Sequence, residues 1–227
     1  AKIRNTVILS SGYAEAGPAG VAAQEELVAR ANALGITIWG PNSLGFINVA
    51  GRACASAIGL VTPILPPSVA IIAQSGASTV ELNDFAYNQN IGASFLGATG
   101  NESMIRLADM IDYLVDHAPT KAIAVFAETI RDPAGFARAA ERARAAKKPI
   151  VILKIGRSEL AGLSAQAHTG SIVGDDKVFD AICERLGIIR VYTAEDLVAI
   201  AGLIAATGPV DAPGLAFMSP SGGACTV

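Results

Sequence analysis

Between residues 68 and 207 the sequence alternates between short apolar runs and longer segments with helical periodicity. Strands that alternate with helices of this length form a parallel sheet with helices on both faces, so this alternation restricts the fold strongly. The expected strands are residues 68–73, 93–97, 121–127, 149–155 and 188–191, and the expected helices are about 76–90, 102–117, 133–147, 175–186 and 194–206. The sequence therefore predicts an α/β fold with a flavodoxin-like, doubly wound parallel sheet.

The composition is that of a globular chain with a large apolar core. Hydrophobic residues make up 52% and charged residues 16%, and the net charge is −3. No basic stripe is present, so nucleic acid is not an expected partner, and no apolar run approaches the length of a membrane span. The sequence has three cysteines, an odd number, and they are widely spaced: Cys54, Cys183 and Cys225. This pattern predicts neither a disulfide framework nor a metal site. With no signal peptide visible, the expected location is the cytoplasm.

Residues 1–50 are expected to form part of a Rossmann-like domain. The expected elements are strands at 6–9, 36–39 and 46–49 and a helix at about 18–34. Pro18 opens the helix and Gly35 closes it, at the positions where these residues are favoured. The glycine-rich loop that begins such a unit is missing from this sequence, so the domain is expected to be its second half.

Glycine and proline mark two connections between domains. Residues 51–67 contain two glycines and three prolines and are interpreted as a linker before the domain at 68–207. Residues 208–227 are interpreted as a second linker and the start of a third, truncated domain. An apolar run there leads into the turn Ser219–Gly223.

The turn after the strand at 68–73 is a candidate phosphate site. Gln74 is followed by Ser75, Gly76 and Ala77, and a helix starts at once. Free N–H groups and the positive end of a helix dipole suit a phosphate, although Ser75 could equally be a simple cap and Gly76 a tight turn. No Lys or Arg occurs in residues 74–90, so affinity for phosphate is expected to come from the helix terminus. Ser221, Gly222 and Gly223 repeat this chemistry near the end of the chain.

A second glycine-containing turn, residues 97–101, resembles a fragment of a dinucleotide fingerprint. It lacks the third glycine in register and an acidic residue after the next strand, which argues against NAD. Asn101 and Glu102 are instead expected to be the cap and the first-turn acid of the following helix.

His168 and Glu128 are the candidate catalytic residues. His168 lies among small residues, beyond the carboxyl end of the strand at 149–155, where open α/β sheets place ligands. Taken alone, that stretch also fits a histidine tied into a loop by backbone hydrogen bonds. Glu128 ends a central strand at the same edge of the sheet, and its carboxylate would fix the imidazole tautomer. His117, at a helix end, is expected to be an exposed surface residue.

An ordered set of short motifs covers almost the whole chain and resembles one known family. The motifs are residues 10–17, 40–45, 74–77, 100–102, 154–158, 168–171 and 188–191. Together they are similar to the NDP-forming, or ADP-forming, acyl-CoA synthetases, which are relatives of the succinyl-CoA synthetase α subunit. One departure is Ser43, which stands where many members of that family carry Cys.

This resemblance implies a CoA-binding domain up to residue 50 and a phosphohistidine domain at 68–207. It implies that His168 is the phosphorylated histidine and that CoA contacts Ser11, Gly12, Pro41, Asn42 and Ser43. ATP, ADP and Mg²⁺ would be bound mainly by an ATP-grasp domain or subunit that this sequence does not contain. The protein is expected to be oligomeric, and its substrates are a small carboxylic acid, CoA and phosphate.

The implied reaction is acyl-CoA formation by an acid–thiol ligase, through acyl phosphate and phosphohistidine. The helix N-terminus at Ser75–Ala77 would neutralise a phosphoryl group, with residues 219–223 as a second set of donors, because phosphoryl transfer depends on positioning and on charge stabilisation. An acyl-CoA-sensing regulatory module is the alternative, although such modules usually lose the histidine. A nicotinamide-dependent oxidoreductase is disfavoured by the missing fingerprint. The sequence does not identify the acid, the direction of flux or the oligomeric state.

Overall fold

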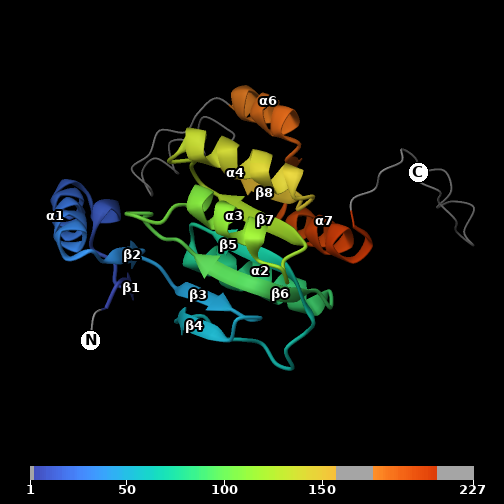
Figure 1. The fold of residues 1–227 in the computed structure, drawn as a ribbon, viewed down its shortest axis with the longest axis horizontal. Coiled ribbons are helices and arrows are strands. Elements are labelled where there is room, and N and C mark those ends of the chain that lie inside the picture. The colour runs from blue at the N-terminus through green and yellow to red at the C-terminus, as the bar shows by residue number, and fades with distance from the viewer. Residues whose placement is uncertain (1–2, 157–175, 209–227) are drawn as a thin grey trace, which may run out of the picture.

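The structure is a computed structural model, which describes residues 3–156 and 176–208 (Figure 1). The N-terminal part consists of β1 (Asn5–Val7), the 3-10 helix η1 (Ala14–Ala16), α1 (Pro18–Leu34) and β2 (Thr37–Trp39). The strands that follow are β3 (Gly45–Asn48), β4 (Ala53–Ser56), β5 (Pro67–Ala73), β6 (Gly92–Ala98), β7 (Ala122–Ala127), β8 (Ile150–Lys154) and β9 (Ile189–Val191). The helices among them are α2 (Gly76–Asn88), α3 (Leu107–Asp116), α4 (Pro133–Ala145), α6 (Asp176–Leu186) and α7 (Ala194–Thr207).

Seven strands form one sheet in the order β4-β3-β6-β5-β7-β8-β9. Five neighbouring strands of this sheet, β6-β5-β7-β8-β9, are parallel. If they are numbered 1 to 5 along the chain, their order in the sheet is 2-1-3-4-5, as in flavodoxin-like sheets. The predicted fold class is therefore confirmed. The strand order reverses between β5 and β7, and such a reversal leaves a crevice at the carboxyl ends of the two strands.

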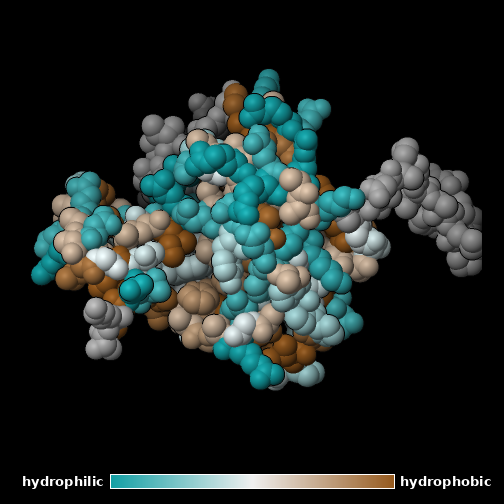
Figure 2. All heavy atoms as spheres, in the orientation of Figure 1, coloured by the Kyte–Doolittle hydropathy of each residue, from teal (hydrophilic) through white to brown (hydrophobic). Residues whose placement is uncertain are grey.

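Helices cover both faces of this sheet (Figure 1). Helices α3, α4 and α6 pack on one face, and α2 and α7 pack on the other. In β5 the side chains of Ala70 and Ile72 pack in the core under α3, α4 and α6, whereas those of Val69 and Ile71 pack in the core under α2 and α7. Because both faces are dry, the strand is an unbroken apolar run instead of an alternating one. The outer sides of α3 and α4 are mostly hydrophilic (Figure 2).

The structure differs from the sequence prediction at residues 45–56. Strand β3 pairs antiparallel with both β6 and β4, so two antiparallel strands extend the large sheet. Residues 53–56, which were expected to be part of a linker, therefore form β4. The aromatic ring of Phe46 stacks on that of Phe95, with ring centroids 5.8 Å apart. That contact joins residues about 50 positions apart, which no local sequence pattern specifies.

The start of α3 and the residue after its end also differ from expectation. The helix begins at Leu107 instead of 102, because Glu102 has a φ of 57° and its carboxylate accepts the Leu107 N–H at 2.9 Å. His117 was expected to be exposed, and this is wrong. Its ring nitrogens lie 2.8 Å from Thr120 Oγ1 and 3.2 Å from Asn48 Oδ1. Burial and the nearby charge of Lys148 lower the pKa of His117.

Within residues 3–156 and 176–208, no helix has the length and apolar character needed to cross a bilayer. The two cysteines in those ranges, Cys54 and Cys183, are free thiols. Burial raises the pKa of Cys183 to about 11, so this thiol is protonated and unreactive at neutral pH.

Candidate functional site

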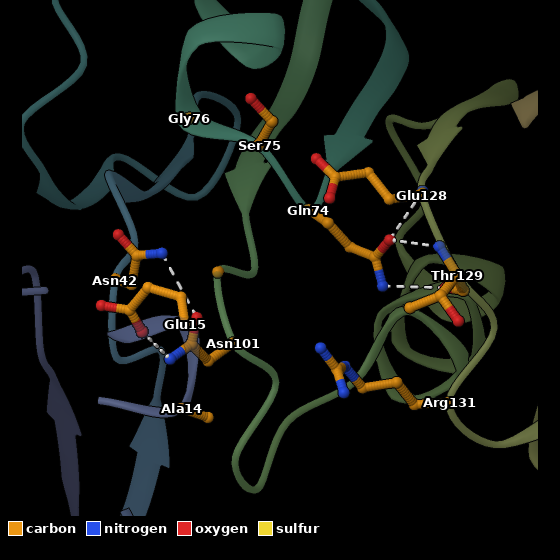
Figure 3. A pocket seen from close by; sticks show the side chains of 11 residues that line it. Ala14, Glu15, Asn42, Gln74, Ser75, Gly76, Asn101, Glu128, Thr129 and Arg131 are labelled. Atoms are coloured by element: carbon orange, nitrogen blue, oxygen red, sulfur yellow. Dashed lines mark hydrogen bonds between the residues drawn. The ribbon is translucent and has the colours of Figure 1, made fainter. Parts of the chain in front are cut away.

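A polar pocket lies at the reversal point of the sheet, between the carboxyl ends of β5 and β7 (Figure 3). Its volume is about 170 Å³, well below the roughly 300–1,000 Å³ typical of sites that enclose a drug-sized ligand. The lining residues are Ala14, Glu15, Asn42, Gln74, Ser75, Gly76, Gly100, Asn101, Glu128, Thr129 and Arg131. A cavity of this size and polarity suits a small anion or the reacting end of a larger ligand.

The first wall of the pocket is the N-terminus of α2. Ser75 is the helix cap, and its hydroxyl accepts the Ser78 N–H at 3.3 Å. The capping interpretation of Ser75 is thus confirmed, and phosphate binding there stays a prediction. Ser75 and Gly76 line the pocket, whereas Ala77 lines a separate hollow on the outer side of α2. A β-carbon added at Gly76 would lie 2.5 Å from Leu44 Cγ, so a side chain at this position would collide with Leu44.

Gln74 ties the ends of β5 and β7 together. Its side-chain Oε1 accepts the N–H groups of Glu128, at 2.7 Å, and Thr129, at 3.0 Å. Its Nε2 donates to the Thr129 carbonyl oxygen at 2.9 Å. The Gln74 side chain is almost fully buried, and such a satisfied polar bridge fixes the loop that follows β7.

Glu128 is the first residue after β7, and its half-buried side chain points into the pocket (Figure 3). The hydrogen bond from its N–H to Gln74 fixes its backbone, which in turn aims the side chain. Strand β8 lies beside β7 in parallel, with Lys154 opposite Ala127. The chain therefore leaves β8 at the same edge of the sheet where Glu128 lies.

The buried carboxylate of Glu102 lies behind the pocket. Its Oε1 accepts from Thr99 Oγ1 at 3.0 Å, and its Oε2 lies 3.7 Å from Arg131 Nε. Burial raises the pKa of Glu102, although hydrogen bonds from Gln74, Leu107 and Thr99 and the charge of Arg131 oppose the shift. Figure 3 shows the Arg131 guanidinium pointing into the pocket.

Asn101 connects the sheet domain to the N-terminal part. Its Nδ2 donates to Glu15 Oε2 at 2.5 Å and to Gln24 Oε1 at 2.9 Å, and its Oδ1 accepts from Asn42 Nδ2 at 3.2 Å. Burial alone would raise the pKa of Glu15, but the hydrogen bonds from Asn101 and from the Gly12 N–H lower it. The pocket therefore contains charged and polar groups from both parts of the chain.

The five residues predicted to contact CoA lie in two turns of the N-terminal part. Ser11 and Gly12 are exposed, and the Gly12 N–H donates to Glu15 Oε1 at 2.6 Å. Pro41 is buried and follows a cis peptide bond, and Asn42 lines the pocket. A β-carbon at Gly100 would lie 2.3 Å from the Pro41 carbonyl oxygen, so the turn that contains Gly100 approaches the turn at residues 40–45 too closely for a side chain at position 100.

Ser43, the fifth of these residues, is 3% exposed and lies inside the joint between the two parts. Its hydroxyl donates to the Ala98 carbonyl oxygen and accepts from Trp39 Nε1 at 3.0 Å and from the Gly45 N–H at 2.8 Å. The contacts that the structure gives Ser43 are thus internal ones, which hold the turn at residues 40–45 against β6.

Four predicted site residues lie outside the described residues: His168, Ser221, Gly222 and Gly223. Among the residues that are described, no group of His, Cys, Asp and Glu side chains could hold a metal ion. Gln74, Asn101 and Arg131 were not predicted as site residues. Each lies within four residues of the carboxyl end of a strand, where open α/β sheets bind ligands, and this position is the sequence signal that could have identified them.

Comparison with known proteins shows similarity to CoA ligases. The family model described as succinyl-CoA ligase like flavodoxin domain matches residues 66–204. The chain is 36% identical, over 186 residues, to the alpha subunit of ADP-forming acetate–CoA ligase I of Pyrococcus furiosus, covering 82% of this chain and 40% of that protein. It is 35% identical, over 219 residues, to a trans-feruloyl-CoA synthase from an unknown prokaryotic organism, covering 95% of this chain and 31% of that protein.

Among solved structures, the chain is similar to dinucleotide forming acetyl-coenzyme A synthetase 1 of Candidatus Korarchaeum cryptofilum, in complex with phosphate and ADP. The TM-score is 0.80 at 29% sequence identity, covering 88% of this chain and 42% of that one. The chain thus spans less than half the length of each of these relatives.

Proposed function

Since the chain belongs to the family of succinyl-CoA ligase-like flavodoxin domains, we propose that it is the CoA-binding and phosphohistidine-bearing segment of an ADP-forming acid–thiol ligase. Such an enzyme forms acyl-CoA from a carboxylic acid, CoA and ATP. Support comes from the similarity to ligases named as ADP-forming and from the solved relative that holds phosphate and ADP. The single observation that carries the proposal is the pocket, in which the N-terminus of α2 and the Glu128 carboxylate surround one small polar volume.

In the direction of ATP formation, the proposed reaction has three steps. Phosphate attacks the thioester carbonyl of acyl-CoA, which gives acyl phosphate and CoA. His168 then takes the phosphoryl group from acyl phosphate and releases the carboxylic acid. Phosphohistidine finally passes the phosphoryl group to ADP, which forms ATP and restores the free histidine.

The residues at the end of β5 would bind the phosphoryl group. The Ser75–Gly76 turn presents backbone N–H groups at a helix N-terminus, which favours an anion there. Glu128 would hydrogen-bond one imidazole nitrogen of His168, which keeps the other nitrogen unprotonated and stabilises positive charge on the ring. The segment that leads to His168 begins where β8 ends, at the edge of the sheet that carries Glu128, which is compatible with this role.

The binding partners in this proposal come from both sides of the pocket. CoA would approach from the turns that carry Ser11, Gly12, Pro41 and Asn42, with Ser43 supporting the second turn. ATP or ADP, with Mg²⁺, would be bound by an ATP-grasp domain or subunit. The proposal does not specify which carboxylic acid is the substrate, since the relatives are named for acids as different as acetate and ferulate. The proposal also includes that the protein is oligomeric and acts in a reducing cytoplasm.

The test is phosphorylation of His168 in the full-length protein, together with its nucleotide-binding partner. Labelled ATP and Mg²⁺ are expected to give an acid-labile, base-stable phosphoenzyme that His168→Ala abolishes. His117→Ala is the matched control, because His117 is the other histidine of the chain and is expected to leave the label in place. Label that persists in His168→Ala contradicts the assignment. CoA binding without any phosphoenzyme supports the acyl-CoA-sensing module instead.

A further inference from the structure

Arg131 is the single cation among the described residues that line the pocket. Glu15 and Glu128 place two carboxylates around the same volume. A phosphate that entered would meet both negative charges, while the N-terminus of α2 supplies only about half a positive charge. The proposed ligand therefore needs a further positive charge in the pocket, and Arg131 is placed to provide it.

The buried Glu102 carboxylate defines how Arg131 is held. The Glu102 side chain is 1% exposed, and its backbone has a φ of 57°, which is uncommon for a residue other than glycine. Such a conformation persists only where the surroundings enforce it, and here Thr99 and Leu107 both donate hydrogen bonds to the carboxylate.

Glu102 contacts the Arg131 guanidinium at Nε, the nitrogen next to the aliphatic part of the side chain. Glu102 Oε2 lies 3.7 Å from Arg131 Nε, a distance that makes an ion pair and is too long for a direct hydrogen bond. The distal end of the guanidinium points into the pocket, and 31% of the Arg131 side chain is exposed (Figure 3). This orientation presents the planar fork of N–H groups that matches a phosphate or carboxylate.

We propose that Arg131 binds the phosphoryl group across the pocket from the N-terminus of α2, and that Glu102 is the residue that positions the guanidinium. This inference rests on the proposed function and adds a phosphate-binding side chain to it. The ligand it concerns is inorganic phosphate or the phosphoryl end of acyl phosphate, and not the phosphates of CoA. A rigid carboxylate behind the guanidinium lowers the entropy lost when the phosphate binds.

The experiment measures phosphate affinity in the full-length protein with its nucleotide-binding partner. Calorimetric titration with inorganic phosphate needs no turnover, and KM values for phosphate and for acetyl-CoA are measured in parallel during ATP formation. Arg131→Met is expected to weaken phosphate binding about tenfold to a hundredfold, because charge-assisted hydrogen bonds are lost. Arg131→Lys is expected to recover part of this loss, since it keeps the charge without the fork.

Two further variants separate positioning from structure. Arg138→Met is the matched control, since Arg138 is an exposed arginine on the neighbouring helix α4 and does not line the pocket. Glu102→Gln is expected to weaken phosphate binding by less than Arg131→Met does. The double variant is expected to match Arg131→Met within about twofold, because Glu102 acts through Arg131.

Unchanged phosphate affinity in Arg131→Met overturns the inference, as does a change in the KM for acetyl-CoA alone. An additive loss in the double variant overturns the positioning role of Glu102. If Arg131→Met does not fold, Arg131→Lys decides by the same titration, and phosphate affinity equal to that of the wild type overturns the inference. A wild-type protein that never forms a phosphoenzyme contradicts the proposed function, while the titration still decides whether Arg131 binds phosphate.

Discussion

At the scale of single residues, Gln74 holds the backbone from which the Glu128 side chain enters the pocket. The Gln74 side chain holds two consecutive N–H groups and one carbonyl oxygen of the loop after β7. Replacing it with an apolar residue would leave those buried groups unpaired, at about 1–3 kcal/mol for each. The backbone position of Glu128 thus depends on a buried polar bridge between two neighbouring strands.

Glu128→Gln tests whether this carboxylate acts in the reaction. The substitution keeps the size and one hydrogen bond of the side chain, but it removes the charge that would stabilise a positively charged imidazole. The rate of His168 phosphorylation is expected to fall by about 10²–10³-fold, the effect typical of removing a stabilising group from a reacting centre. Rapid-quench measurement of phosphoenzyme formation gives that rate. Glu141→Gln, an exposed position on α4, is the control. Wild-type kinetics in Glu128→Gln would show that the carboxylate is only structural.

At the scale of elements, the start of α2 is fixed by the turn at residues 40–45. Leu44 from that turn packs where a side chain of residue 76 would lie, with Cγ only 2.5 Å from the position of an added β-carbon. The glycine is therefore required because of a neighbouring side chain, and not only because a tight turn favours it. The same contact connects the N-terminal part of the chain to the phosphate wall of the pocket.

Gly76→Val is expected to damage phosphate binding more than Ser75→Ala. Valine forces Leu44 or the helix to move, which shifts the N–H groups of the first turn of α2. Loss of the Ser75 cap costs about 0.5–2 kcal/mol of stability but leaves the backbone in place. Crystals of each variant soaked in phosphate, with titrations in solution, compare the two. Gly59→Val is the control, since a β-carbon there meets nothing within 4 Å. A normally bound anion in Gly76→Val would contradict the role of the turn.

At the scale of the whole molecule, the pocket exists because two parts of the chain are held against each other. Asn101 joins Glu15, Gln24 and Asn42, and Trp39 Nε1 donates to the Ala98 carbonyl oxygen at 2.6 Å. These bonds cross between segments separated by about 60 to 90 residues. If they loosened, the side of the pocket that carries Glu15 and Asn42 would separate from the side that carries Glu128.

The joint is expected to weaken at acid pH through Glu15. Hydrogen bonds to its carboxylate lower the pKa of Glu15 from the usual value of 4.5, so the folded state favours the charged form. The resulting stability is present above about pH 4.5 and is lost as the pH falls through the lower, folded-state pKa. Glu15→Gln keeps the shape of the side chain but removes this titration.

Urea unfolding between pH 6 and pH 3 measures the effect. The difference in unfolding free energy between the wild type and Glu15→Gln is expected to be at most about 1 kcal/mol at pH 6, because solvent screens the site. It is expected to shrink as the pH falls. Glu26→Gln on α1 is the control, since the Glu26 side chain is 72% exposed and pairs with Arg30 at the surface. A difference that grows toward pH 3 would contradict this account of the joint.

The sequence alone determined the parallel strands of the large sheet, the presence of the helices between them and the class of the fold. Unbroken apolar runs such as residues 69–73 specify strands buried on both faces, and Ser75 and Gly35 specify the ends of helices, because these signals arise from neighbouring residues. The same local reasoning identified the turn at residues 75–77 and Glu128 as candidate site residues. It also gave the order of the motifs that indicate the family.

Only the tertiary structure decided which of these residues meet. The pairing of β3 with β6, the bridge from Gln74 to the loop after β7 and the place of Arg131 in the pocket all join residues distant in sequence. The absence of Lys and Arg from residues 74–90 had predicted a phosphate site without a cation, yet the cation Arg131 reaches the pocket from the loop that follows β7, the neighbouring strand of the sheet. Local patterns cannot specify such contacts, because they depend on strand order, which is set by the packing of the whole sheet.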